Sequence, residues 1–280
     1  MSKRTKNSNI ITIALATIAA ILLVVANSAL WVHRYVFDTE NFTRITTTSL
    51  SSQSSRDAIA GSIINRALEN RPVIRSVVEE PATRVISGLL ATDQFSGALD
   101  AVTSRFHVLV TSRSQESISI NLEGVKSTAA HIISLFDTQA TGENLGNIPD
   151  EIIIINAQNI PDFYRYGVLF LWLGPLSFLL AATALVYPYY RRLLSVRRIL
   201  LIQGLAITVF SLLAMSIGPL FKPPLLANID QVYARVVANN IYDAFINTFI
   251  NQTKILLGIG CLAIASAVFL YVFPKLRHKQ

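Results

Sequence analysis

The stretch Ile10–Val32 reads IITIALATIAAILLVVANSALWV and carries no charged side chain over its 23 residues. Three further uncharged stretches, 168–187, 199–217 and 255–273, have the same apolar character. A helix needs roughly 20 apolar residues to cross the hydrocarbon core of a bilayer, which is about 30 Å thick. The sequence therefore predicts a mainly α-helical, polytopic membrane protein with four transmembrane helices.

The overall composition favours the same class. Hydrophobic residues make up 52% of the chain and charged residues only 15%, whereas about a quarter of the residues in a soluble domain are usually charged. A net charge of +7 would suggest nucleic acid as the partner of a soluble protein, but membrane orientation accounts for the basic excess. We therefore expect no nucleic-acid partner. The single cysteine, Cys261, cannot form a disulfide within the chain.

The basic residues predict the orientation of the spans. Segments 1–9, 188–198 and 274–280 hold ten Lys and Arg residues and none of the 17 Asp and Glu residues. Because cytoplasmic segments carry an excess of Lys and Arg, we expect these three segments in the cytoplasm and segments 33–167 and 218–254 outside it. The chain is then a multi-pass plasma-membrane protein with both termini cytoplasmic. The residues that set this orientation are Lys3, Arg4, Lys6, Arg191, Arg192, Arg197, Arg198, Lys275, Arg277 and Lys279.

The first span has two interpretations. It follows a basic start, and Asn27-Ser28-Ala29 offers small residues near its end, as in a signal peptide. The apolar core of a signal peptide is typically about 7 to 15 residues, and this run is longer, which favours an uncleaved signal anchor. Cleavage would leave three spans with the same orientation.

The large outer segment, 33–167, shows mainly the periodicity of short amphipathic helices that form one bundle. Capping residues and first-turn prolines mark where these helices begin. The predicted starts are Asp38 or Thr39, Ser54, Pro72, Pro81 and Asp93.

The periodicity changes farther along this segment. Ser117–Leu122 alternates polar and apolar residues, and Glu151–Asn156 is a second strand candidate. A helix over 125–136 and a loop over 137–150 separate them, which is long enough for a parallel crossover or an antiparallel return. We therefore expect an extracytoplasmic helical domain that contains a small two-stranded β element.

The smaller outer segment, 218–254, begins with a predicted break at Gly218-Pro219. From about Asn228 its apolar residues keep a helical period straight into the fourth span. We expect one long helix whose outer half lies against the large outer domain. Because such a junction is rigid, it could transmit a change in the position of the outer domain to the membrane-spanning helices.

Small and polar residues within the spans are candidates for helix packing. Asn27 and Gln203 are candidates for hydrogen bonds between helices, and Gly174-Pro175 for a kink in the second span. A strip of small residues suggests close packing of the fourth span, either within the chain or in a homo-oligomer. The strip consists of Gly258, Gly260, Ala263 and Ala267.

The residues that carry chemistry form no recognisable motif. None of the four spans contains Asp, Glu, Lys, Arg or His, which transport pathways commonly need. His33, His107, His131 and His278 are widely separated, and Glu79-Glu80 is typical of a solvated helix face. Nucleophile and phosphate-binding signatures are missing as well. We therefore expect no catalytic residue, cofactor or metal, and a protein that is not an enzyme.

The layout and several short motifs resemble a group of uncharacterised four-span integral membrane proteins of actinobacteria and related Gram-positive bacteria. The motifs are Leu30-Trp31, Phe37-Asp38-Thr39-Glu40-Asn41-Phe42, Asn121-Leu122-Glu123 and the strand Ile152–Asn156. The resemblance implies a fold and a location in the cell envelope, and it supplies no catalytic residue.

These observations favour a non-enzymatic envelope protein whose outer helical domain binds a protein, lipid or wall partner. The spans would anchor it among membrane lipids. The alternative is a membrane subunit of an ABC-type permease or mechanotransmission complex, because cell-division permeases have the same order of spans and outer segments. The cytoplasmic segments are short for docking an ATPase, which disfavours that alternative.

Overall fold

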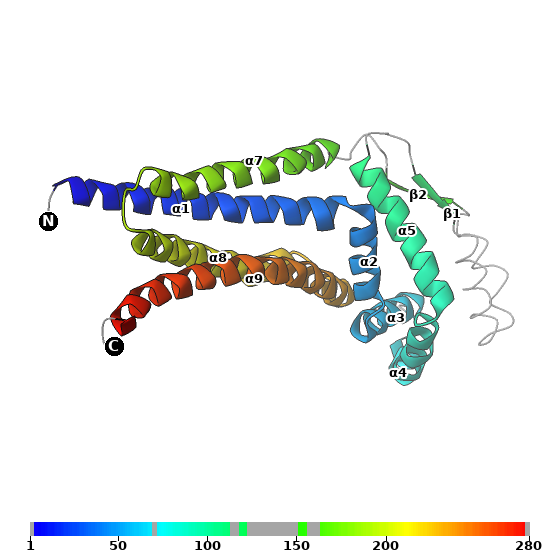
Figure 1. Cartoon of the computed structure of the whole chain (residues 1–280). Helices are drawn as coiled ribbons and strands as arrows, with labels where there is room; N and C mark the ends of the chain where they lie inside the picture. The colour runs from blue at the N-terminus through cyan, green and yellow to red at the C-terminus, as the bar shows by residue number, and fades with distance from the viewer. Residues whose placement is uncertain (1–2, 69–71, 113–117, 122–150, 156–162, 278–280) are drawn as a thin grey trace.

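The computed structural model describes residues 3–68, 72–112, 118–121, 151–155 and 163–277. Four long helices run side by side, and shorter helices lie across one end of them (Figure 1). The long helices are α1 (Lys3–Trp31), α7 (Phe163–Tyr190), α8 (Val196–Ala227) and α9 (Val232–Arg277). The shorter elements are a π-helix η1 (Val32–Phe37), α2 (Thr39–Leu50), α3 (Gln53–Ala67), α4 (Pro72–Leu89) and α5 (Asp93–Thr111).

The four long helices are long and apolar enough to cross a membrane, which confirms the prediction of a mainly α-helical polytopic protein. The start of α1, the end of α9 and the α7–α8 connection lie at one end of the bundle (Figure 1). We call this the basic end, because the predicted basic segments meet there. Helices α2 to α5 lie at the opposite end and are called the head domain.

Packing inside the bundle relies on small side chains. α1 packs on α7 and α8, and α8 packs on α9. The core at their crossing consists of Ala20, Leu23, Ala181 and Ile207. Large apolar side chains such as Trp172 and Leu262 point outward, as they do in proteins whose surroundings are lipid.

The chain turns between α1 and α2. α1 ends in the π-helix η1, and Asp38 then adopts an extended conformation. Its carboxylate accepts a hydrogen bond from the Asn41 backbone N–H and so caps the first turn of α2. The first span therefore does not continue straight into the head domain, and α2 crosses its end (Figure 1).

The head helices differ from the predictions at three points. The N-cap of α5 is Thr92, whose hydroxyl accepts from the Phe95 backbone N–H, so the predicted cap Asp93 is instead the first residue of the helix. The N-cap of α3 is Ser52, whose hydroxyl accepts from the Ser55 backbone N–H, so the predicted start at Ser54 was wrong by two residues. Pro72 begins α4 as predicted, but Pro81 lies inside that helix instead of opening another. Packing of α4 along α3 keeps the helix continuous, although Pro81 has no N–H to donate.

Strands β1 (Ile118–Asn121) and β2 (Glu151–Ile155) pair antiparallel beside α5. Ile120 is opposite Ile152, Asn121 is opposite Glu151, and the register shifts between Ile118 and Ser119. Of the two connections that the sequence left open, the structure has the antiparallel one. The predicted helix over 125–136 and loop over 137–150 lie outside the described residues.

The predicted break at Gly218-Pro219 was wrong, because α8 continues through it to Ala227. Packing on α9 holds this stretch in place: Gly218 lies against Ile246, and the Tyr242 hydroxyl donates to the Gly218 carbonyl at 2.7 Å. The turn instead spans 228–231, so α9 begins at Val232 and not near Asn228. From there α9 is one unbroken helix of 46 residues, as the periodicity predicted.

Candidate functional site

Helix α9 connects the bundle to the head domain. At 1.5 Å per residue its 46 residues extend about 70 Å, more than twice the roughly 30 Å of a bilayer core. Along that length α9 contacts α8, α1, α2 and α3. Polar and aromatic contacts to these helices form one line along α9, which we call the α9 seam.

The lower part of the seam joins α9 to α1. The Asn27 amide donates to the Thr253 hydroxyl at 3.0 Å, and the Gln252 amide donates to the Asn27 carbonyl at 2.9 Å and to its side-chain oxygen at 3.0 Å. The Trp31 indole N–H donates to the Thr248 hydroxyl at 2.8 Å. Asn27 therefore makes hydrogen bonds between two helices, α1 and α9, as the sequence suggested.

The middle of the seam lies at the corner between the bundle and the head domain. The Phe42 ring stacks on the His107 ring at a centroid distance of 4.4 Å and contacts the Phe245 ring at 5.5 Å. His107 is only 3% exposed. Its Nε2 lies 2.7 Å from the Val36 carbonyl, which can only accept, so Nε2 carries the proton and donates. The Thr39 hydroxyl is 3.0 Å from Nδ1, and α5 is thereby fixed to the end of η1.

The upper part of the seam joins α9 to α3 and α4. The Asn240 amide donates to the hydroxyls of Ser54 and Ser55, each at 2.8 Å. The Tyr233 ring lies so close to Gly61 that an added Cβ would stand 2.6 Å from it. The Tyr233 hydroxyl donates to Glu79 at 3.2 Å. Burial and the neighbouring Glu79 carboxylate raise the pKa of Tyr233, so the phenol keeps the proton that it donates.

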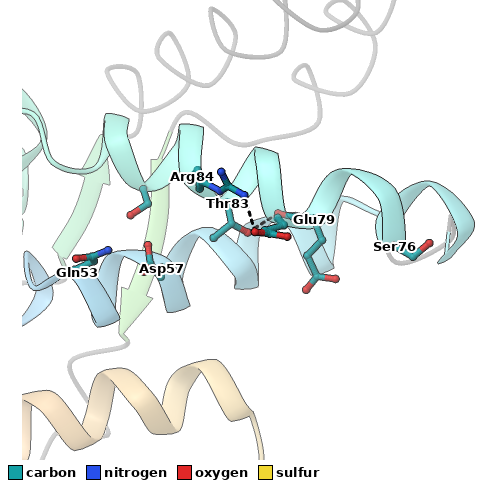
Figure 2. A pocket seen from close by; sticks show the side chains of 8 residues that line it. Gln53, Asp57, Ser76, Glu79, Thr83 and Arg84 are labelled. Carbon is teal, nitrogen blue, oxygen red and sulfur yellow. Dashed lines mark hydrogen bonds and ion pairs between the residues drawn. The ribbon is translucent and has the colours of Figure 1, made fainter.

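A cleft of about 620 Å³ lies between α3 and α4, next to the end of the seam. We call it the acidic cleft. Figure 2 shows Gln53 and Asp57 on α3 facing Thr83 and Arg84 on α4, with Glu79 one turn along. The residues that line it are Gln53, Asp57, Ser76, Glu79, Glu80, Thr83, Arg84 and Ser87.

The charges in the acidic cleft are unevenly paired. Arg84 donates to Glu80 at 2.6 Å, and Glu79 receives the Tyr233 hydroxyl and lies 3.8 Å from Arg75. Asp57, which is half-buried, makes neither an ion pair nor a hydrogen bond with any residue in the described ranges. The cleft therefore presents one carboxylate without a counter-charge from the described part of the chain.

A second cleft, of about 980 Å³, lies between α2 and α5 and is lined mostly by hydroxyl side chains. The hydroxyl oxygens of Thr43, Thr47 and Ser51 are closed off from solvent and have no partner among the described residues. They do not offer hydrogen bonds to a ligand in this conformation. The acidic cleft is for that reason the better candidate for ligand binding.

The predicted packing residues fall into two groups. Gln203 is buried between α7 and α8, where its amide donates to the Leu185 carbonyl at 2.8 Å and its oxygen accepts from Tyr189 at 3.0 Å. Gly260 lies against α8, because an added Cβ would stand 2.5 Å from the Thr208 hydroxyl. Gly258, in contrast, has nothing within 4 Å of such a Cβ.

The other members of these predictions are placed as follows. Ala267 is buried and Ala263 half-buried, so only part of the small-residue strip packs within the chain. Gly174 lies against Ala26 and Ala29 of α1, and Pro175 is inside α7, where a kink stays a prediction.

Nine of the ten basic residues that were predicted to set the orientation belong to described segments at the basic end. Arg191 and Arg192 are in the α7–α8 connection, and Arg197, near the start of α8, lies 4.8 Å from the Tyr271 ring. Lys3, Arg4 and Lys6 belong to the start of α1, and Arg198 to the start of α8. Lys275 and Arg277 belong to the end of α9, whereas Lys279 lies outside the described residues.

The sequence analysis assigned no role in a site to Asp57, Ser87 or Tyr233. They come from α3, α4 and α9, and only the folded chain brings them together. The position of Tyr233 on the apolar period of the long helix was visible, but not its partner.

Comparisons with protein families, with curated proteins and with solved structures find no match to this chain. The class of the protein is therefore assigned from its sequence and structure alone. It is a mainly α-helical chain with four helices able to cross a membrane. The resemblance to four-span actinobacterial proteins stays a prediction.

Proposed function

We propose that this is a non-enzymatic protein of the cell envelope whose head domain binds a protein, lipid or wall partner outside the cytoplasm. The basic end faces the cytoplasm and the anionic lipids of the plasma membrane, since Lys and Arg are retained on that side. The head domain and the β1–β2 pair are then extracytoplasmic. The protein acts as a scaffold or a sensor anchored by its four spans.

One observation carries this proposal: α9 is a single helix that belongs both to the head domain and to the bundle. The seam residues Asn240 and Asn27 hold it to the head domain at one end and to α1 at the other. Hydrogen bonds at both ends resist independent movement of the head domain. A partner bound there would act on the position of α9 in the membrane.

Site-specific photocrosslinking in native membranes tests the proposal. A photoreactive amino acid replaces Val77, which is 76% exposed on α4 of the head domain, or Leu262, which is 68% exposed within a predicted span. Mass spectrometry then identifies the captured material. We expect an envelope protein or lipid-linked wall material from position 77 and membrane lipids from position 262.

The competing class, a permease or mechanotransmission subunit, predicts a different capture. The α7–α8 connection has five residues, 191–195, which leaves little surface for an ATPase. Tagged protein purified from native membranes in mild detergent would bring down an ATPase if that class were correct. An ATPase at a stoichiometric level, with nothing captured from position 77, would overturn our proposal.

A further inference from the structure

We propose that the acidic cleft binds a small alkylammonium group, either of a free amine or of a lysine side chain in a peptide. The inference deepens the proposed function, since it rests on a head domain that binds a ligand. It identifies the place where that ligand binds and the chemistry that recognises it.

The charge pattern points to a cation. Glu80 has Arg84 as its partner, and Glu79 has Tyr233 and Arg75 near it, while Asp57 has no cationic partner in the described ranges. A half-buried carboxylate in a cleft that two more carboxylates also line favours a positively charged ligand over a neutral or anionic one. The ligand would supply the counter-charge that the described chain lacks.

A hydroxyl that opens onto the cleft is an independent sign of a ligand. Ser87 lines the cleft and is only 7% exposed, yet it makes no hydrogen bond to any residue that the structure describes. Its oxygen is not closed off as those of Thr43, Thr47 and Ser51 are, so a ligand atom in the cleft could be its hydrogen-bond partner. An ammonium group has three donors, and the Ser87 hydroxyl, the Asp57 carboxylate and the Gln53 amide oxygen are acceptors in the same cleft.

The separation of the carboxylates within the cleft favours an organic cation over a metal ion as the ligand. Within the described ranges no three His, Cys, Asp or Glu residues are close enough together to hold a metal. The cleft volume of about 620 Å³ lies within the range of small-molecule sites, about 300 to 1,000 Å³. An ammonium group on a short alkyl chain fits both observations.

The position of the cleft connects this site to the membrane. Glu79 lines the cleft and accepts the hydrogen bond from Tyr233 of α9. An ammonium group that donates to the Glu79 carboxylate therefore competes with the Tyr233 hydroxyl for this acceptor. Binding would therefore weaken the uppermost contact of the seam. Through this contact, ligand binding in the cleft would affect α9 and hence the membrane-spanning helices.

Isothermal titration of the full chain in lipid nanodiscs tests the site. The probes are 1,5-diaminopentane, the neutral isostere 1,5-pentanediol and a tripeptide with one central lysine. We expect saturable binding of the amine and not of the diol. Stronger binding of the peptide would identify a peptide side chain as the source of the ammonium group, and weaker binding would identify a free amine.

Three variants locate the site. Asp57→Asn keeps the shape of the side chain and should weaken amine binding at least about tenfold, because a charge-assisted hydrogen bond is lost. Ser87→Ala should weaken it about threefold to tenfold. The matched control is Asp100→Asn, which removes the same charge from the α2–α5 cleft and should leave the affinity unchanged.

Three results would overturn the assignment: no saturable amine binding, an equal loss in Asp100→Asn, or displacement of the amine by Mg²⁺ at the same concentration. The thermal midpoint of each variant shows that it is folded. This experiment can fail while crosslinking at Val77 succeeds, in which case only the acidic cleft is wrong. Amine binding without any partner at Val77 would instead count against the proposed function.

Discussion

Substituting Gly260 tests the close crossing of α8 and α9 most directly. An added Cβ would stand 2.5 Å from the Thr208 hydroxyl, 2.9 Å from the Thr208 backbone nitrogen and 3.1 Å from the Gly204 carbonyl oxygen. Two of these atoms are backbone, so the helices must separate to accommodate a methyl group. Overpacking of this kind costs about 1 to 3 kcal/mol, whereas replacing a helical glycine by alanine gains about 0.5 to 1 kcal/mol.

The control is two residues away in the same helix. A Cβ at Gly258 would meet nothing within 4 Å, so Gly258→Ala keeps the gain in helix stability without the overpacking. The free energies of unfolding of Gly260→Ala and Gly258→Ala should differ by about 1 to 3 kcal/mol, with Gly260→Ala the less stable. Reversible unfolding in mixed detergent micelles, followed by tryptophan fluorescence, measures the difference. Equal stabilities would refute the tight crossing.

Three further predictions concern the corner, the seam and the orientation. His107→Ala should lower the free energy of unfolding by about 2 to 4 kcal/mol, because it leaves a cavity and a helix-end carbonyl without its donor; thermal melts check this. Asn240→Ala removes the hydrogen bonds to three serine hydroxyls and should speed proteolysis of the head domain while the span fragments stay intact. In a background without Cys261, a membrane-impermeant maleimide should label Val77→Cys in intact cells but not Tyr190→Cys, and the reverse pattern would invert the proposed orientation.

The number and position of the spans could be predicted from the sequence, because an apolar run of about 20 residues is long enough to cross the bilayer core as a helix. The ends of the helices could not. Gly218-Pro219 carries a strong local signal for a break, yet α8 continues because Ile246 and Tyr242 of α9 pack against this stretch. Pro81 within α4 is the same case on a smaller scale.

The small-residue strip shows a different limit. Gly258 and Gly260 are two residues apart, which places them on nearly opposite sides of a helix with 3.6 residues per turn. The sequence can therefore show that one of them faces away from a given neighbour, but not which one. Only the packing of α9 on α8 assigns the contact to Gly260.

The acidic cleft was beyond prediction for a related reason. Glu79 is typical of a solvated helix face when the helix is taken alone, and Asp57 is a single acidic residue within the short helix α3. Their common environment arises because α3 and α4 pack against each other and Tyr233 reaches them from α9. Contacts between residues this far apart in the chain leave no local pattern.

The head domain is attached to α1 and to α9 through different contacts, and this arrangement has a mechanical consequence. His107 fixes α5 to the end of η1, which continues α1, whereas Tyr233 and Asn240 fix α3 and α4 to α9. A displacement of α1 relative to α9 must therefore deform the head domain or break one set of contacts. The Tyr233–Glu79 hydrogen bond is a single bond beside an open cleft, while His107 is buried and stacked, so the head domain should yield first at α4. A ligand that occupies the cleft would act at this weaker point.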